Sequence, residues 1–119
     1  MENYKLGAME TKFAELMWEH EPITSGQLVK LCAKEFSWKK STTYTMLRRI
    51  CQRKIFQNKD GVVSSIITRP EFQALQSEQF VKETFGGSLP LFLAAFTTRK
   101  KMSDNEINQL QKLINRHKG

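Results

Sequence analysis

The sequence predicts a mainly α-helical chain with one small β-hairpin, divided into a compact N-terminal domain and a C-terminal helical region. Three observations predict this class. Apolar residues recur at helical spacing over much of the 119 residues, an Asp60-Gly61 pair separates two β-prone runs, and several Ser or Thr residues stand three positions before Glu or Gln. We place the boundary after Arg69, so that the domains are 1–69 and 70–119.

Two helices are predicted before residue 37. The first has an apolar stripe of Leu6, Met9, Phe13, Leu16 and Met17. We expect it to run to about His20 and to end before Pro22, because proline disrupts a helix interior. Thr24 and Gln27 have the spacing of a capping box, and the apolar residues from Leu28 onward continue a second helix.

A third helix is predicted to follow Ser41 or Thr42, either of which can be its N-cap. Its packing side comprises Thr43, Met46, Leu47 and Ile50, and its polar stripe comprises Ser41, Thr45, Arg48 and Gln52, flanked by Tyr44 and Arg49. A merely solvated face usually carries pairs of opposite charge, but this segment contains no acid. Side chains of these types hydrogen-bond to phosphates and base edges, so the stripe is a candidate nucleic-acid surface.

A two-stranded ribbon is predicted after the third helix. Ile55 and Phe56 begin an extended run, Asp60-Gly61 is a strong signal for a type I′ turn, and residues 62–68 are β-prone. Lys59, near the turn, is placed either for a backbone phosphate or for solubility, and the sequence leaves both readings open. Three helices followed by a β-hairpin describe a winged helix-turn-helix.

Positive charge is concentrated in one segment. The net charge is +7 and the isoelectric point is about 9.6. From Lys34 to Lys59 there are eight basic residues and one acid, a surplus of seven that equals the net charge of the chain. This distribution favours a polyanionic partner such as nucleic acid or an anionic membrane surface.

The region after Pro70 is predicted to form two or three helices rich in large apolar side chains. Gly86-Gly87 marks a break, Ser88 caps the following segment, and Ser103 and Glu106 form a capping box. One alternative is that these side chains pack back on the chain's own core, but we expect this apolar surface to pack on the same helices of a second chain. The residues assigned to dimerisation are Phe72, Leu75, Phe80, Phe85, Leu89, Phe92, Phe96, Ile107, Leu110 and Ile114.

The sequence offers no motif for catalysis, metal binding or a cofactor. Cys32 and Cys51 fall among apolar helical positions, and the two histidines, His20 and His117, are nearly a chain length apart. We therefore expect no metal, no cofactor and no enzymatic activity. No basic leader with an apolar core opens the chain, and no apolar run approaches the roughly 18 residues of a membrane span. We expect a soluble, cytoplasmic protein.

Several segments taken together resemble a known family. In chain order they are Trp18, Pro22-Ile23-Thr24, Trp38, the segment TTYTMLRRI at 42–50, and Gly86-Gly87-Ser88-Leu89 followed by a Ser-x-x-Glu helix. From about Leu6 to Leu113 the chain resembles the penicillinase-repressor and methicillin-resistance-repressor family of bacterial regulators. The resemblance implies a homodimeric repressor of β-lactam antibiotic-resistance genes, bound to a dyad operator in double-stranded DNA. The alternative is a winged-helix module used for protein or RNA contacts without operator binding.

Two features distinguish branches of that family. In the antibiotic-resistance branch, a pathway with a membrane sensor protease inactivates the repressor at an Asn-Phe bond, where this chain has Ala95-Phe96. The copper-responsive branch carries a Cys-x-Cys pair near its C-terminus. No cysteine follows Cys51 here, so that branch is excluded.

The third helix and the hairpin supply the predicted DNA contacts. The helix start is expected to hold phosphates, its middle to enter the major groove, and Arg49 to hold the backbone. The phosphate set at the start is Lys39, Lys40 and Ser41, and the groove set is Thr42, Tyr44, Thr45 and Arg48. Lys59 completes the set on the hairpin.

Overall fold

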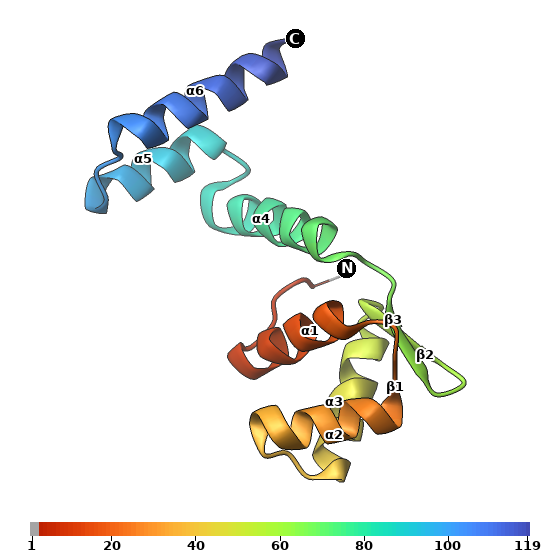
Figure 1. Cartoon of the computed structure of the whole chain (residues 1–119). Coiled ribbons are helices and arrows are strands. Elements are labelled where there is room, and N and C mark those ends of the chain that lie inside the picture. The colour runs from red at the N-terminus through yellow and green to blue at the C-terminus, as the bar shows by residue number, and fades with distance from the viewer. Residues whose placement is uncertain (1–2) are drawn as a thin grey trace. The chain divides into compact units, whose positions relative to one another are not determined.

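The computed structural model describes residues 3–119 and shows, within them, six α-helices and three short strands (Figure 1). The chain forms two compact units, the first ending at Gln79 and the second comprising Phe80–Gly119. The sequence placed a boundary after Arg69, which is the first residue of helix α4, Arg69–Phe85. The compact units divide later, inside that helix.

The first two helices match the prediction. Helix α1 comprises Ala8–His20, and helix α2 comprises Ser25–Phe36. Thr24 caps α2 as expected: its hydroxyl accepts from the Gln27 N–H at 3.1 Å, and the Gln27 side chain accepts from the Thr24 N–H at 3.1 Å. The capping box therefore fixes the start of α2.

Helix α3 comprises Lys40–Gln52, so the prediction of Ser41 or Thr42 as its N-cap was wrong. Lys39 is the N-cap, in extended backbone and without a side-chain hydrogen bond. The ring of Trp38 packs against Phe13 and Phe36, with centroids 5.4 and 4.9 Å apart. This packing anchors the loop at Trp38, and the helix begins directly after it.

The predicted ribbon is present and is part of a three-stranded antiparallel sheet. Strand β2 comprises Phe56–Lys59 and strand β3 comprises Val62–Ser65; together with their turn we call them the wing. The turn residues Asp60 and Gly61 have φ of 52° and 82°, the left-handed values that a type I′ turn requires. The strand order is β1-β3-β2.

Strand β1, Ile23–Thr24, was not predicted. Ile23 pairs with Val63 and Thr24 with Val62. The Ser25 N–H, at the start of α2, also donates to the carbonyl of Gly61 at 2.8 Å. The turn of the wing is thereby tied to α2.

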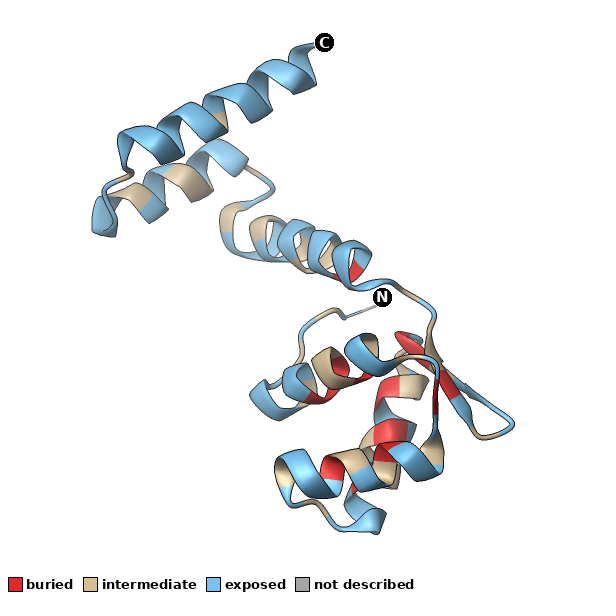
Figure 2. Cartoon of the chain, viewed as in Figure 1, coloured by how far each residue is buried: buried red, intermediate tan, exposed pale blue. Residues whose placement is uncertain are grey.

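The hydrophobic core lies in the first unit (Figure 2). Its residues are Phe13, Ala14, Met17, Ile23, Leu28, Cys32, Leu47, Ile50, Ile55, Phe56, Val63 and Phe72. Phe72, which the sequence assigned to dimerisation, is only 2% exposed in this core. Its ring lies against Tyr4 and Trp18, with centroid distances of 6.0 and 5.6 Å, so it belongs to the folding of the first unit.

The second unit continues from the end of α4 through helices α5, Leu89–Arg99, and α6, Asp104–Lys118. Both predicted caps are present, since Ser88 accepts from the Leu91 N–H at 3.2 Å and Ser103 accepts from the Glu106 N–H at 3.1 Å. Gly86 and Gly87 have φ of 57° and 85° and form the predicted break. Neither α5 nor α6 contains a buried residue.

Candidate nucleic-acid interface

Helix α3 has one side in the core and the opposite side in solvent. Its three buried residues are Thr43, Leu47 and Ile50. The predicted polar stripe, Ser41, Thr45, Arg48 and Gln52, is exposed along its whole length. A helix with one packed face and one polar face free of acids can dock against a polyanion without any change in its own packing.

The other predicted contacts on this helix are also accessible. Lys39, Lys40, Thr42 and Arg49 are exposed. Tyr44 differs from them because it is half-buried, its hydroxyl donates to the Ser25 hydroxyl at 3.4 Å, and the Lys40 ammonium lies 6.0 Å from the centre of its ring. Tyr44 therefore joins α3 to the start of α2 and leaves one edge of its ring at the surface.

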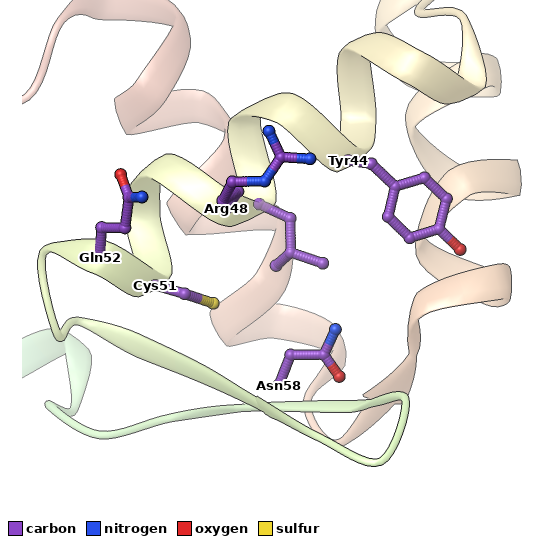
Figure 3. Close-up of a pocket in the computed structure, with 6 residues that line it drawn as sticks. Tyr44, Arg48, Cys51, Gln52 and Asn58 are labelled. Carbon is purple, nitrogen blue, oxygen red and sulfur yellow. The ribbon is translucent and has the colours of Figure 1, made fainter.

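A cleft of about 440 Å³ lies between α3 and the wing (Figure 3). Leu47 and Cys51 form its apolar floor, and polar groups of Tyr44, Arg48, Gln52 and Asn58 surround it. The cleft is thus continuous with the polar stripe of α3, and one residue of β2, Asn58, lies across it from Arg48 (Figure 3).

Asn58 is the cleft residue that sequence reasoning missed. It pairs with the buried Val63 and lies two positions after the buried Phe56, so it shares their face of the sheet. Lys59 pairs instead with Val62, which is 43% exposed, and lies on the other face. The period-two alternation from Phe56 was the available signal, whereas the choice of Lys59 followed its charge alone.

One cation of the basic segment serves another purpose. The Arg53 guanidinium donates to the backbone carbonyls of Asn3, at 2.5 Å, and of Lys5, and it forms an ion pair with Glu10 at 3.5 Å. Its side chain is only 25% exposed. Arg53 is therefore committed to contacts within the protein, and the charge surplus that faces solvent is smaller than the sequence count.

The two cysteines are free thiols and behave as small apolar residues. Burial raises the pKa of both thiols, and for Cys32 the neighbouring Thr43 side chain partly opposes this. Residues 3–119 contain no group of three His, Cys, Asp or Glu side chains arranged to hold a metal ion. Across the same residues, every helix is too short or too polar to span a membrane.

Eight of the ten residues assigned to dimerisation lie in the second unit and form a largely exposed apolar surface there. Phe80, Leu89, Phe96, Ile107 and Ile114 are each between 45% and 57% exposed, and Phe85, Phe92 and Leu110 are half-buried. The rings of Phe80, Phe85, Phe92 and Phe96 contact one another, with centroids 5.6 to 6.1 Å apart. Leu75, the remaining member, is half-buried on α4 in the first unit.

A groove of about 400 Å³ lies between α5 and α6 on this surface. It is lined by Phe92, Leu93, Phe96, Met102, Glu106, Gln109, Leu110 and Leu113. The second unit therefore has an aromatic cluster of its own but leaves one side of its helix pair uncovered.

The chain is similar in sequence to known proteins over most of its length. The family model described as penicillinase repressor matches residues 6–116. The chain is 25% identical over 113 residues to a penicillinase repressor of Bacillus licheniformis, covering 92% of this chain and 88% of that protein. It is 17% identical over 117 residues to the methicillin resistance regulatory protein MecI of Staphylococcus epidermidis, covering 95% of each chain.

Proposed function

The chain belongs to the penicillinase repressor family, and on that premise we propose that it is a homodimeric, sequence-specific repressor that occupies a dyad operator. The family consists of non-enzymatic, DNA-binding transcriptional repressors that bind operators as dimers. The observation that carries the proposal is the exposed, acid-free polar stripe of α3 opposite its buried side.

In this proposal α3 is the recognition helix and enters the major groove. Lys39, Lys40 and Ser41, together with the positive end of the helix dipole, hold phosphates. Thr42, Thr45 and Arg48 reach base edges, where an Arg guanidinium bonds guanine O6 and N7 in bidentate fashion. Arg49 holds the backbone, and the exposed edge of Tyr44 contacts the groove wall.

The cleft beside α3 extends this interface to the wing. Asn58 lies on the cleft side of β2, across the cleft from Arg48, and we propose that its amide donates to the sugar-phosphate strand that borders the groove. Lys59, on the opposite face of the wing, then contributes only a long-range, salt-screened attraction to phosphate.

Dimerisation is proposed to occur through the second unit. The exposed side chains of α5 and α6 form an apolar surface that a soluble monomer rarely presents. A two-fold axis through this surface would place two α3 helices on half-sites about one helical turn, roughly 10 base pairs, apart or a multiple of that distance.

The regulated genes are a finer part of the proposal. The two relatives are named for penicillinase and methicillin resistance, and we propose that this chain acts in the cytoplasm on genes of the same kind. The proposal does not include cleavage at the Asn-Phe bond of that branch, because Ala95 occupies the position of the asparagine in α5.

Selection of duplexes from a randomised pool, followed by a salt titration on the selected sequence, tests this function. Repression by operator binding predicts a dyad consensus. For about six phosphate contacts, it also predicts a loss of affinity on the order of 10³-fold between roughly 50 and 200 mM salt. Indifference to every duplex at low salt would contradict the proposal and would favour a winged helix used for protein or RNA contacts.

A further inference from the structure

The residues that precede α1 make contacts that DNA binding does not require. Arg53 is the C-cap of α3, and its guanidinium donates to the backbone carbonyls of Asn3 and Lys5 and pairs with Glu10 of α1. These partners lie between 43 and 50 residues away in the sequence. One side chain therefore fastens the N-terminal segment, residues 3–7, to the end of the recognition helix.

The same segment is fastened to α4. The Tyr4 N–H donates to the side-chain carbonyl of Gln79 at 2.8 Å, and the Gln76 amide donates to the Tyr4 carbonyl at 3.0 Å. The Tyr4 ring meets Phe72 edge-on at 6.0 Å. Phe72, Gln76 and Gln79 are spaced by four and three positions and so share one face of α4.

Arginine is suited to this position because its planar guanidinium has five donors and can serve two carbonyls and a carboxylate at once. Backbone carbonyls in an irregular segment have no helix or sheet partners and need donors from elsewhere. A lysine in this place would carry the same charge on one rotating ammonium and would not hold all three partners in a fixed arrangement.

We propose that Arg53 is a positioning residue: through residues 3–5 it fixes α4 against α3, and thereby sets the half-site spacing that the dimer accepts. The inference rests on the proposed operator binding. Helix α4 is continuous from Arg69 to Phe85 and carries the chain from the first unit into the second. A fixed α4 therefore limits the distances at which two recognition helices can bind one duplex.

The first turn of α4 has separate anchors, so loss of Arg53 weakens the hold on the later turns without unfolding the helix. The Trp18 indole N–H donates to the Ile67 carbonyl at 3.0 Å, and Arg69 pairs with Glu15 at 2.7 Å. Phe72 stays in the core. The turns at Gln76 and Gln79 are the ones that the N-terminal segment holds.

The test measures the affinity of the full-length protein for three duplexes. One is the dyad that the wild type selects, one has about 2 base pairs added between the same half-sites, and one carries a single half-site. The wild type is expected to lose affinity about tenfold or more on the altered spacing. Arg53→Ala is expected to reduce this preference to about twofold, a change of the size expected from losing charge-assisted hydrogen bonds. It is expected to bind the single half-site as the wild type does.

Two matched variants separate geometry from charge. Lys54→Asn removes an exposed cation one residue further on, and asparagine tolerates the left-handed φ of 60° at that position. It is expected to keep the spacing preference. Arg53→Lys keeps the charge and is expected to lose most of the preference. The double variant Gln76→Ala/Gln79→Ala removes the two side chains that bond the Tyr4 backbone, so it breaks the other end of the same connection and serves as the second variant if Arg53→Ala does not fold.

The outcomes distinguish this inference from the proposed function. If Arg53→Ala weakens the dyad and the half-site equally and keeps the spacing preference, Arg53 is only structural and the inference fails. A wild type that accepts both spacings equally also refutes it, although operator binding would stand. A wild type that binds none of the duplexes refutes the proposed function itself.

Discussion

The two units of this chain use apolar residues in opposite ways. All twelve residues of the buried core belong to the first unit and lie at or before Phe72. The second unit has none in α5 or α6, yet it carries seven of the ten most exposed large apolar side chains among the described residues. The first unit has a buried core of its own, whereas the second leaves much of its apolar surface exposed.

This difference assigns separate tasks to the units. In the proposed function, the buried core of the first unit holds the recognition helix in place within a single subunit, so the first unit determines the contacts with each half-site. Pairing of an exposed apolar surface is favourable because it removes that surface from water, so in the proposed function the second unit determines how many half-sites are bound together. Changes in the two units should therefore be distinguishable by their dependence on protein concentration.

The largest effect is expected from the core of the first unit. Phe56→Ala should lower the free energy of unfolding by about 3–5 kcal/mol, because a fully buried ring is replaced by a cavity. Trp18, whose ring is 5.2 Å from Phe56, reports the transition by fluorescence in a urea titration. Leu91→Ala, at a position that is 59% exposed in the second unit, is the control and should leave this transition within about 0.5 kcal/mol.

The next largest effect is expected from a variant that disrupts pairing through the second unit. Phe96→Asp places a charge where apolar surface would be covered, and it should weaken dimerisation by about 3 kcal/mol, or more than 100-fold in the dissociation constant. Dilution calorimetry measures that constant. Thr98→Asp adds the same charge at another exposed position of α5 and should have little effect. Equal loss in both variants would mean that charge, and not the apolar surface, governs pairing.

A smaller effect separates base reading from phosphate binding within the first unit. Arg48→Ala should reduce discrimination at one base-pair position by about 1–3 kcal/mol, whereas Lys39→Ala should weaken binding to all duplexes alike. Binding to matched and scrambled duplexes measures both. The same loss on both duplexes for both variants would refute these roles.

The smallest effect is expected at the wing, where Asn58 and Lys59 are neighbours on opposite faces. Asn58→Ala should weaken binding to all duplexes by about 1 kcal/mol, since it removes one hydrogen bond to the sugar-phosphate strand. Lys59→Ala should cost less than about 0.5 kcal/mol, and the loss should vanish at high salt. Fluorescence anisotropy at two salt concentrations measures the affinity of both variants for DNA. A larger loss for Lys59→Ala than for Asn58→Ala would place the DNA on the other side of the wing.

Local signals predicted most of the fold. The capping boxes at Thr24 and Ser103, the Asp60-Gly61 turn and the Gly86-Gly87 break each act over a few residues and were found where expected. Strand β1 was missed because two residues carry no periodicity and their partners, Val62 and Val63, are distant in sequence. The start of α3 was misplaced because the packing of Trp38, which is not a local signal, decides it.

The candidate site could be predicted in part for the same reason. The polar stripe of α3 follows from helical periodicity alone, and the structure brings its members to one face. Residue type could not show that Arg53 is bound to distant backbone carbonyls or that Phe72 lies in the core of the first unit. A helix that packs in its own domain and a helix that packs on a second chain both have an apolar face, and only tertiary structure shows what covers it.

The mass of the protein alone and bound to its selected duplex, measured by analytical ultracentrifugation, tests the central claim most directly. We predict two chains in the free protein at micromolar concentration and two chains on each dyad duplex. A stable single chain that binds the dyad at one per duplex would contradict the account.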